Sequence, residues 1–304
     1  MNEKKDSHFK EKEFQMKKIL SLMLIVSSFS VLATDKVIYG EDNRVDVFES
    51  KDNLLVELSK STAAMISSSK VKIKAYGQAE ITGSSLQSRG MCASERFAKQ
   101  MTSANCSGSL VGPNLIATAG HCIRSQRDCE SYNWVFDFKV ESSDQFAMTV
   151  PRSSVYKCKK IIARSLATVD GSKDDWALIE LDRNVAGRDY LEVREEGQPA
   201  VGTDLTVIGH PTGLPTKIAD GATVTKLDGN FFYADLDTYG GNSGSAVFNT
   251  KTGVVEGILV RGATDYVYDS SQGCRVSNVL DQGVERSEGV SNISRLSKLI
   301  LENR

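Results

Sequence analysis

Short apolar runs recur along most of the chain, with turn-forming residues between them. Many of these runs alternate, as in Trp134-Val135-Phe136-Asp137-Phe138, which is the pattern of a half-buried strand. Strands that are short and regularly spaced predict an all-β barrel or sandwich. The predicted strands comprise residues 115–117, 134–140, 155–162, 176–181, 205–208, 222–225, 231–236, 246–248 and 254–260.

Two segments have helical patterns instead. Asn53 is placed to cap a helix that continues through Leu58. Near the C-terminus, apolar residues recur with helical spacing and predict one face of a helix. These residues are Val290, Ile293, Leu296 and Ile300. We find no internal repeat and no low-complexity linker.

The first residues have the layout of a secretory signal peptide. A basic region at Met16-Lys17-Lys18 precedes a 14-residue apolar stretch that ends at Leu32. We predict a signal peptide over residues 1–33, with translation starting at Met16, because the preceding residues are polar and mixed in charge. An uncleaved anchor is the alternative, although the apolar stretch is short for a membrane span. Export predicts a secreted or periplasmic protein without stable membrane insertion after cleavage.

Composition narrows the classes of function. The 304 residues are 40% hydrophobic and 25% charged, which favours a packed core over disorder. A formal charge of −2 implies no strongly basic face, so nucleic acid is not an expected partner. Three histidines leave little room for a His-based metal site.

The cysteines are even in number and all follow the predicted signal. In an exported protein they predict three disulfides, and six cysteines allow 15 connectivities. The six are Cys92, Cys106, Cys122, Cys129, Cys158 and Cys274.

Three motifs carry candidate chemistry. Thr118-Ala-Gly-His121-Cys122 places a histidine at the end of a predicted strand, where it can be aimed into a cleft. Asp175 immediately precedes an apolar strand, where a carboxylate can hold a histidine in one tautomer. Glycines surround Ser243 in Gly240-Gly-Asn-Ser-Gly-Ser, and a tight turn there lets backbone N–H groups converge on an oxyanion. Singly, each motif also fits a structural role; together, in this order, they form a catalytic set.

From these motifs the chain resembles a chymotrypsin-fold, trypsin-like serine peptidase of the bacterial glutamyl-endopeptidase-like branch. The resemblance rests on the block from Cys106 to Cys122, on Asp175-Trp-Ala-Leu, and on Gly241-Asn-Ser-Gly-Ser. Gly257-Ile-Leu-Val-Arg-Gly262 aligns with the strand that borders the substrate cleft in that family. The resemblance covers about residues 61–304, after an N-terminal segment over 34–60.

The resemblance implies two six-stranded antiparallel β-barrels with the active site between them, followed by the C-terminal helix. It implies that Ser243 is the nucleophile, His121 the base and Asp175 the group that orients it. The N–H groups of Gly241 and Ser243 would form the oxyanion hole. Neither a metal nor an organic cofactor is implied, the substrates are proteins or peptides, and we expect a monomer.

The disulfide pairing follows in part from the resemblance, which implies Cys106–Cys122. The other four cysteines allow three pairings. We favour Cys129–Cys158, because it closes a short loop around a two-strand unit, and this leaves Cys92–Cys274 by elimination.

The residues of the substrate cleft bear on specificity. The resemblance implies that Asp237, Thr238, Leu259, Val260 and Gly262 contact the substrate. Asp237 lies six residues before Ser243, where trypsin-type enzymes place the carboxylate of the pocket floor, so we expect Arg or Lys before the scissile bond. Two alternatives stay open: Asp237 points to solvent at a strand end, or Arg261 neutralises it.

Other departures from the family concern activation and glutamate. Asn242 replaces the aspartate that pairs with a new N-terminus in trypsin-type enzymes, so activation by that ion pair is not expected. Val37-Ile-Tyr-Gly resembles the start of mature glutamyl endopeptidases, which suggests trimming after Lys36. Leu259 replaces their substrate-reading histidine, which disfavours glutamate specificity, and Val260 replaces a serine that normally supports the aspartate.

Two further functions were weighed against this one. An α/β-hydrolase needs a histidine after the nucleophile, and no histidine follows Ser243. His210, in Gly-His-Pro, could replace His121 as the base, but it is better interpreted as a turn residue. An inactive family member used for binding is the remaining alternative, and the complete set of His121, Asp175 and Ser243 argues against it.

Overall fold

The computed structural model describes residues 38–143, 145–169, 172–262, 264–280 and 287–304. The predicted signal peptide over residues 1–33 lies outside the described residues. Among the described residues, no helix is long and apolar enough to cross a membrane.

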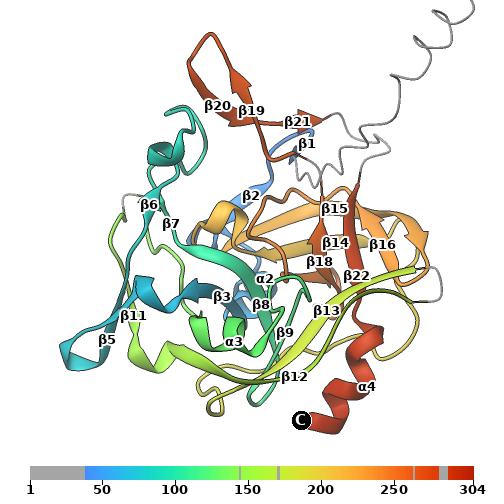
Figure 1. Ribbon diagram of the computed structural model, residues 1–304. Coiled ribbons are helices and arrows are strands. Elements are labelled where there is room, and N and C mark those ends of the chain that lie inside the picture. Colours follow the sequence, from blue (N-terminus) through green and yellow to red (C-terminus); the bar gives the residue numbers. More distant parts are fainter. Residues whose placement is uncertain (1–37, 144, 170–171, 263, 281–286) are drawn as a thin grey trace, which may run out of the picture. The chain divides into compact units, whose positions relative to one another are not determined.

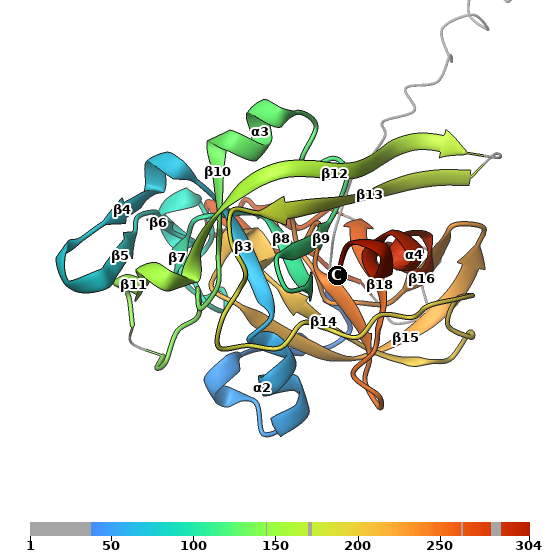
Figure 2. The same ribbon diagram turned by 90° about the horizontal axis from the view of Figure 1, so that it is seen from below.

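The first half of the described chain contains a closed antiparallel barrel of six strands, in the order β10-β12-β13-β9-β8-β3 (Figure 1). The strands are β3 (Thr62–Ser67), β8 (Ala104–Gly112), β9 (Leu115–Thr118), β10 (Tyr132–Val135), β12 (Val155–Val169) and β13 (Ser172–Leu181). The long pair β12 and β13 extends beyond the barrel as a ribbon, which Figure 2 shows from below.

The second half forms another barrel, because β14 pairs with both β17 and β15 and so closes the sheet. Its strands are β14 (Asp204–Gly209), β15 (Lys217–Asp228), β16 (Phe231–Ala234), β17 (Ala246–Asn249), β18 (Val255–Arg261) and β22 (Glu288–Asn292). A short outer strand, β2 (Arg44–Asp46), adds to β15. The two six-stranded barrels confirm the predicted fold class.

Smaller elements decorate the barrels. They are the sheet β11-β5-β4 (Met148–Pro151, Gln78–Ile81, Val71–Ile73), the pairs β6 (Ser84–Ser85) with β7 (Met101–Thr102) and β19 (Tyr266–Asp269) with β20 (Cys274–Ser277), and the parallel pair β1 (Ile38–Tyr39) with β21 (Val279–Leu280). The α-helices are α2 (Asn53–Ser59), α3 (Gln126–Ser131) and α4 (Ser294–Asn303).

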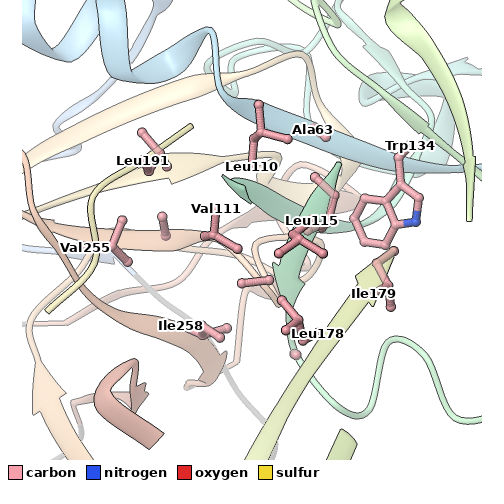
Figure 3. Close-up of a cluster of buried hydrophobic side chains, with 14 of the residues drawn as sticks. Ala63, Leu110, Val111, Leu115, Trp134, Leu178, Ile179, Leu191, Val255 and Ile258 are labelled. Atoms are coloured by element: carbon pink, nitrogen blue, oxygen red, sulfur yellow. The ribbon is translucent and has the colours of Figure 1, made fainter. Parts of the chain in front are cut away.

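A continuous apolar core joins the barrels. Trp134 and Ile179 of the first barrel belong to the same buried cluster as Val255 and Ile258 of the second, as Figure 3 shows. Leu296 and Ile300 of α4 bury one helix face in this cluster. Burial of such side chains contributes about 1.5–3 kcal/mol each, so the barrels are held side by side by the hydrophobic effect.

Three details of the predicted elements are corrected by the structure. The predicted C-terminal helix begins only at Ser294, because Val290 lies in β22, which is hydrogen-bonded to β16 and β18 on its two sides. The predicted strand over 134–140 ends at Val135, and Asp137 takes a positive φ of 61° that interrupts extended backbone. The cap of α2 is Asp52, whose carboxylate accepts the N–H groups of Leu54 and Leu55.

Three disulfides are present, Cys106–Cys122, Cys129–Cys158 and Cys92–Cys274, which are the pairs expected from the sequence. Cys106–Cys122 joins β8 to the residue that follows His121. Cys129–Cys158 joins α3 to β12, and Cys92–Cys274 joins the loop at residue 92 to the β19–β20 hairpin.

The variant Cys129→Ser/Cys158→Ser tests how much one of these bridges stabilises the fold. The bridge closes a 29-residue separation, and a loop of that size is expected to stabilise by about 3–4 kcal/mol through the unfolded chain. Denaturant unfolding of the variant and the wild type, without reductant, measures the difference. An unchanged free energy of unfolding would show that the bridge adds nothing to the contacts between α3 and β12.

Candidate active site

A histidine and a carboxylate meet through two hydrogen bonds at one end of the first barrel. His121 follows β9, and Asp175 lies on β13, the strand that pairs with β9. Asp175 Oδ1 accepts the backbone N–H of His121 at 3.0 Å, and Asp175 Oδ2 lies 2.8 Å from His121 Nδ1. Because the carboxylate accepts at Nδ1, the ring is held in the tautomer that leaves Nε2 for proton exchange.

Gly120 allows this histidine to approach the strands closely. A Cβ atom at Gly120 would overlap the Ser165 carbonyl oxygen and would lie 2.8 Å from the Trp176 carbonyl oxygen. Arg164 Nε also donates to the Gly120 carbonyl at 2.8 Å. A glycine is therefore needed here so that the backbone of residues 120–121 can lie against β12 and β13.

The loop that carries Ser243 connects β16 and β17. Gly241 and Gly244 have φ angles of 99° and 88°, which residues with side chains rarely adopt. Asn242 N–H donates to the Tyr239 carbonyl at 2.9 Å, and Ser245 N–H donates to the Asn242 carbonyl at 2.8 Å. The result is a tight turn that is closed on itself by two backbone hydrogen bonds.

Ser107 of β8 fixes this loop against the first barrel. Its N–H donates to the Ser243 carbonyl at 2.8 Å, and its Oγ donates to the Gly241 carbonyl at 2.8 Å. The same Oγ accepts the N–H of His210 at 3.1 Å. Ser107 was not among the residues predicted from the sequence, although it lies within the block that resembles the family.

His121, Asp175 and Ser243 line one pocket, together with Val260 and Gly262 of the cleft-border segment. The side chain of Asp175 is half as exposed as that of His121, at 14% against 28%. The partly covered carboxylate lies behind the more accessible ring, as a base that must reach a substrate requires.

A model of the trypsin-like peptidase domain matches residues 106–258, which is half of the chain. The chain belongs to the trypsin-like peptidase family.

The chain is also similar to individual proteins. Over 152 residues the chain is 30% identical to the glutamyl endopeptidase of Bacillus licheniformis. The aligned region covers 49% of this chain and 46% of the relative. The chain thus spans about half the length of this curated relative. The solved VesB protease of Vibrio cholerae matches with a TM-score of 0.51 and 16% identity over 86% of this chain and 67% of that chain, which shows a shared fold. A solved Glu endopeptidase in complex with MPD matches with a TM-score of 0.49 and 17% identity, over 88% and 98% of the two chains.

Asp237 of this chain does not lie at the predicted floor of the substrate pocket. Asp237 is buried, and its two oxygens accept the backbone N–H groups of Tyr39 and Asn43 at 2.8 Å each. Burial raises the pKa of Asp237 to about 6, against the lowering effect of those two hydrogen bonds. Asp237 is not among the described residues that line the pocket. Its two oxygens instead hold the N-terminal segment through Tyr39 and Asn43.

The two open alternatives for Asp237 are also excluded. The residue is only 4% exposed, so it does not point to solvent. The Arg261 guanidinium lies over the ring of Phe231, 4.3 Å from its centre, in a cation–π contact.

Two other predicted cleft residues are buried instead. Leu259 belongs to the core of the second barrel, and its carbonyl accepts the N–H of Gly244 at 2.8 Å. Thr238 is buried, and its Oγ1 donates to Glu288 Oε2 at 2.6 Å. Leu259 therefore supports the serine loop through its backbone, and its side chain lies in the barrel core.

Cys106, His121 and Cys122 bring potential metal-ligating atoms within 4.8 Å of one another. Both sulfur atoms belong to the Cys106–Cys122 disulfide, so neither is available as a thiolate ligand. This cluster does not fit a metal site.

His210 differs from His121 in every respect that matters for catalysis. It is fully buried, and its Nδ1 lies 3.1 Å from the Leu214 carbonyl. Burial lowers its pKa from 6.5 to about 3, so the ring is neutral at working pH. His210 does not line the active-site pocket of the described chain, and it is a structural residue.

Ser107→Ala tests the contact between the barrel and the serine loop. The substitution leaves the Gly241 carbonyl without its hydroxyl donor, and a small displacement of the nucleophile lowers turnover by about 10- to 100-fold. Steady-state peptide hydrolysis gives the effect. Ser109→Ala, two residues along β8 and opposite Ala117 of β9, is the matched control and should keep wild-type turnover. Equal turnover in both variants would contradict this role for Ser107.

His210→Gln tests the neutral state of the buried histidine. Since the folded pKa lies below the unfolded one, the unfolded chain binds a proton that the folded chain does not, and stability is lost as pH falls from about 6.5 to about 3. The free energy of unfolding of the wild type should therefore fall more steeply over this range than that of His210→Gln. Urea unfolding at several pH values measures both slopes, and parallel slopes would show that His210 takes up a proton while folded.

Proposed function

We propose that the protein is an exported serine endopeptidase that cleaves protein or peptide substrates through an acyl-enzyme on Ser243. The observation that carries the proposal is the double hydrogen bond between His121 and Asp175 in the pocket that also contains Ser243. Membership of the trypsin-like peptidase family supports it. Three disulfides support export, because such bonds persist in oxidising compartments.

The chemistry begins with the attack of Ser243 Oγ on the substrate carbonyl, while His121 Nε2 takes the hydroxyl proton. Asp175 stabilises the imidazolium that forms, through its bond to Nδ1. The N–H groups of Gly241 and Ser243 stabilise the oxyanion of the tetrahedral intermediate. His121 then gives its proton to the leaving amine, which leaves the acyl-enzyme on Ser243. Water next attacks the acyl carbonyl while His121 takes its proton, and His121 returns this proton to Ser243 Oγ as the acid leaves.

The rigid surroundings of the Gly241 peptide support its role in the oxyanion hole. The peptide that carries the Gly241 N–H has the Gly240 carbonyl at its other end, and this carbonyl accepts the Thr212 N–H at 2.5 Å. The following peptide is fixed through the Gly241 carbonyl, which accepts from Ser107 Oγ. The Gly241 backbone is thus held on both sides. Donors that are oriented before the reaction need no rearrangement when charge develops.

Two kinds of substrate side chain, acidic and basic, are candidates for the residue before the scissile bond. The name of the Bacillus relative suggests glutamate, whereas the resemblance to trypsin-type enzymes suggests Arg or Lys. Leu259 offers no charge or hydrogen bond to a glutamate, and its side chain lies in the barrel core. We therefore propose a preference for basic side chains, carried by a residue other than Asp237.

The variants Ser243→Ala, His121→Ala and Asp175→Asn test the mechanism. Each should lower kcat by about 10⁴-fold or more while thermal unfolding stays close to that of the wild type. Because the residues act as a unit, Ser243→Ala/His121→Ala should be little worse than either single variant.

Labelling with an active-site serine reagent separates the peptidase from an inactive binding protein of the same family. The wild type should incorporate one equivalent at Ser243, and Ser243→Ala should incorporate none. Normal peptide hydrolysis by Ser243→Ala would overturn the proposed function.

A further inference from the structure

Two arginines from distant segments line one side of the active-site pocket. Arg89 ends a 3-10 helix, Gln87–Arg89, and Arg275 lies on β20 of the β19–β20 hairpin, which projects from the barrels in Figure 1. Both residues line the pocket that also contains His121 and Ser243. Both are exposed, so a ligand in the pocket can reach their guanidinium groups.

The backbone next to this arginine pair is fixed across the two segments. Met91 forms a β-bridge with Arg275. The Cys92 N–H donates to the Arg275 carbonyl at 2.9 Å, and the Arg275 N–H donates to the Gly90 carbonyl at 3.0 Å. The disulfide Cys92–Cys274 joins the same segments covalently. Two positive charges are therefore carried by one cross-linked unit at the edge of the pocket.

Protein partners leave most of this hydrogen-bonding capacity unused. Arg89 Nη1 donates to the Thr212 carbonyl at 2.9 Å, and a guanidinium group has five N–H donors. Within the part of the chain that the structure describes, no salt bridge joins Arg89 or Arg275 to an acid. The two charges are thus not neutralised by carboxylates of the described residues.

The acids that line the same pocket already have partners in the protein. These pairs are Asp175 with the His121 ring, Asp174 with Arg295, and Asp265 with the Gly240 N–H. Three more cations line the pocket, and they are Arg124, Lys173 and Arg261. The pocket therefore has an excess of positive side chains, although the chain as a whole has a formal charge of −2. A cleft of one sign attracts ligands of the other sign.

We propose that Arg89 and Arg275 form a subsite for an acidic side chain of the substrate, at a position other than the residue before the scissile bond. This inference rests on the proposed peptidase function and adds a second requirement on its substrates. The planar fork of a guanidinium group matches the two oxygens of a carboxylate, and the hydrogen bonds are charge-assisted. The basic side chain proposed above occupies a different position, which the experiment keeps constant.

The first experiment moves one Glu along a peptide whose residue before the scissile bond is the one that the wild type cleaves best. Glu or Gln stands at one of the three positions before that residue or the three positions after the scissile bond. The peptides are amidated, so that the side chain and not a terminal carboxylate is tested. At one position, kcat/KM for Glu should exceed that for Gln at least about fivefold in the wild type.

The variant Arg89→Gln/Arg275→Gln should bring this ratio of Glu to Gln to within about twofold of unity. A loss of activity common to both peptides cancels in the ratio. Raising the salt concentration from about 0.05 M to about 0.5 M should lower the wild-type ratio, because salt screens exposed charges.

The matched control is Lys99→Gln, which removes one positive charge from the segment that carries Arg89. Lys99 is exposed and does not line the pocket of the described chain, so this variant should keep the wild-type ratio. A wild type with no position at which Glu exceeds Gln would overturn the proposal. A ratio unchanged in Arg89→Gln/Arg275→Gln, or lowered equally by Lys99→Gln, would do the same.

A binding measurement keeps this test independent of catalysis. Calorimetry with Ser243→Ala compares the Glu and Gln peptides, with and without Arg89→Gln/Arg275→Gln. The double substitution should weaken binding of the Glu peptide at least about fivefold, and equal affinities for the two peptides on Ser243→Ala would overturn the subsite. If the Glu peptide binds through the two arginines but Ser243 neither reacts with the serine reagent nor supports hydrolysis, the proposed function fails and the subsite stands.

Discussion

The contact between Ser107 and the serine loop fixes the loop of Ser243 against the barrel that carries His121 and Asp175. His121 and Asp175 belong to the first barrel, whereas Ser243 lies between two strands of the second. A catalytic set must be held to within about 0.5 Å, and the apolar core between the barrels has no directional contacts that could do so. Ser107 supplies direction through its N–H to the Ser243 carbonyl and its Oγ to the Gly241 carbonyl. Cys106, its neighbour, is bonded to Cys122 beside His121, so one strand, β8, is joined to both halves of the site. Gly244 completes the contact, because a Cβ there would overlap the Ser107 carbonyl oxygen.

Surroundings, rather than residue type, decide what the two described histidines can do. His121 has a carboxylate at Nδ1 and an accessible ring, so its charged form can appear and be stabilised during a reaction. His210 has only a backbone carbonyl at Nδ1 and lies where water is excluded, so burial keeps it neutral. Its backbone N–H nevertheless donates to Ser107 Oγ, and Ser107 in turn contacts the serine loop. This structural histidine therefore lies one residue away from the loop of the nucleophile. The Gly-His-Pro sequence thus contributes to the site by supporting it.

Patterns along the chain predicted the strands and the residues of the proposed triad, because alternation and short motifs are local properties, and the two barrels were implied by the family resemblance. They failed where pairing between distant segments decides the outcome. The spacing of Val290, Ile293, Leu296 and Ile300 fits a helix, yet Val290 lies in β22, since hydrogen bonds to β16 and β18 outweigh local preference. Ser107 is a strand residue with no local sign of its role. The position of Glu288 beside Gly262 was also missed, because nothing in its own segment shows that β22 runs beside the cleft border.

The two buried carboxylates near the serine loop show why spacing from the nucleophile does not identify a specificity residue. Asp237 has the expected spacing, but the N-terminal segment reaches it first, and the backbone N–H groups of Tyr39 and Asn43 use both of its oxygens. A carboxylate satisfied in this way stabilises the segment that covers it and offers a substrate little. Glu288 comes from a different strand, is buried beside Gly262, and accepts the hydroxyl of Thr238. The fold therefore uses each of these two acids to hold a neighbouring segment, whereas the sequence predicted that one of them would form the pocket floor. Which segment each acid holds depends on the strands that pack around it, and the absence of a Cβ at Gly262 leaves room for the second carboxylate.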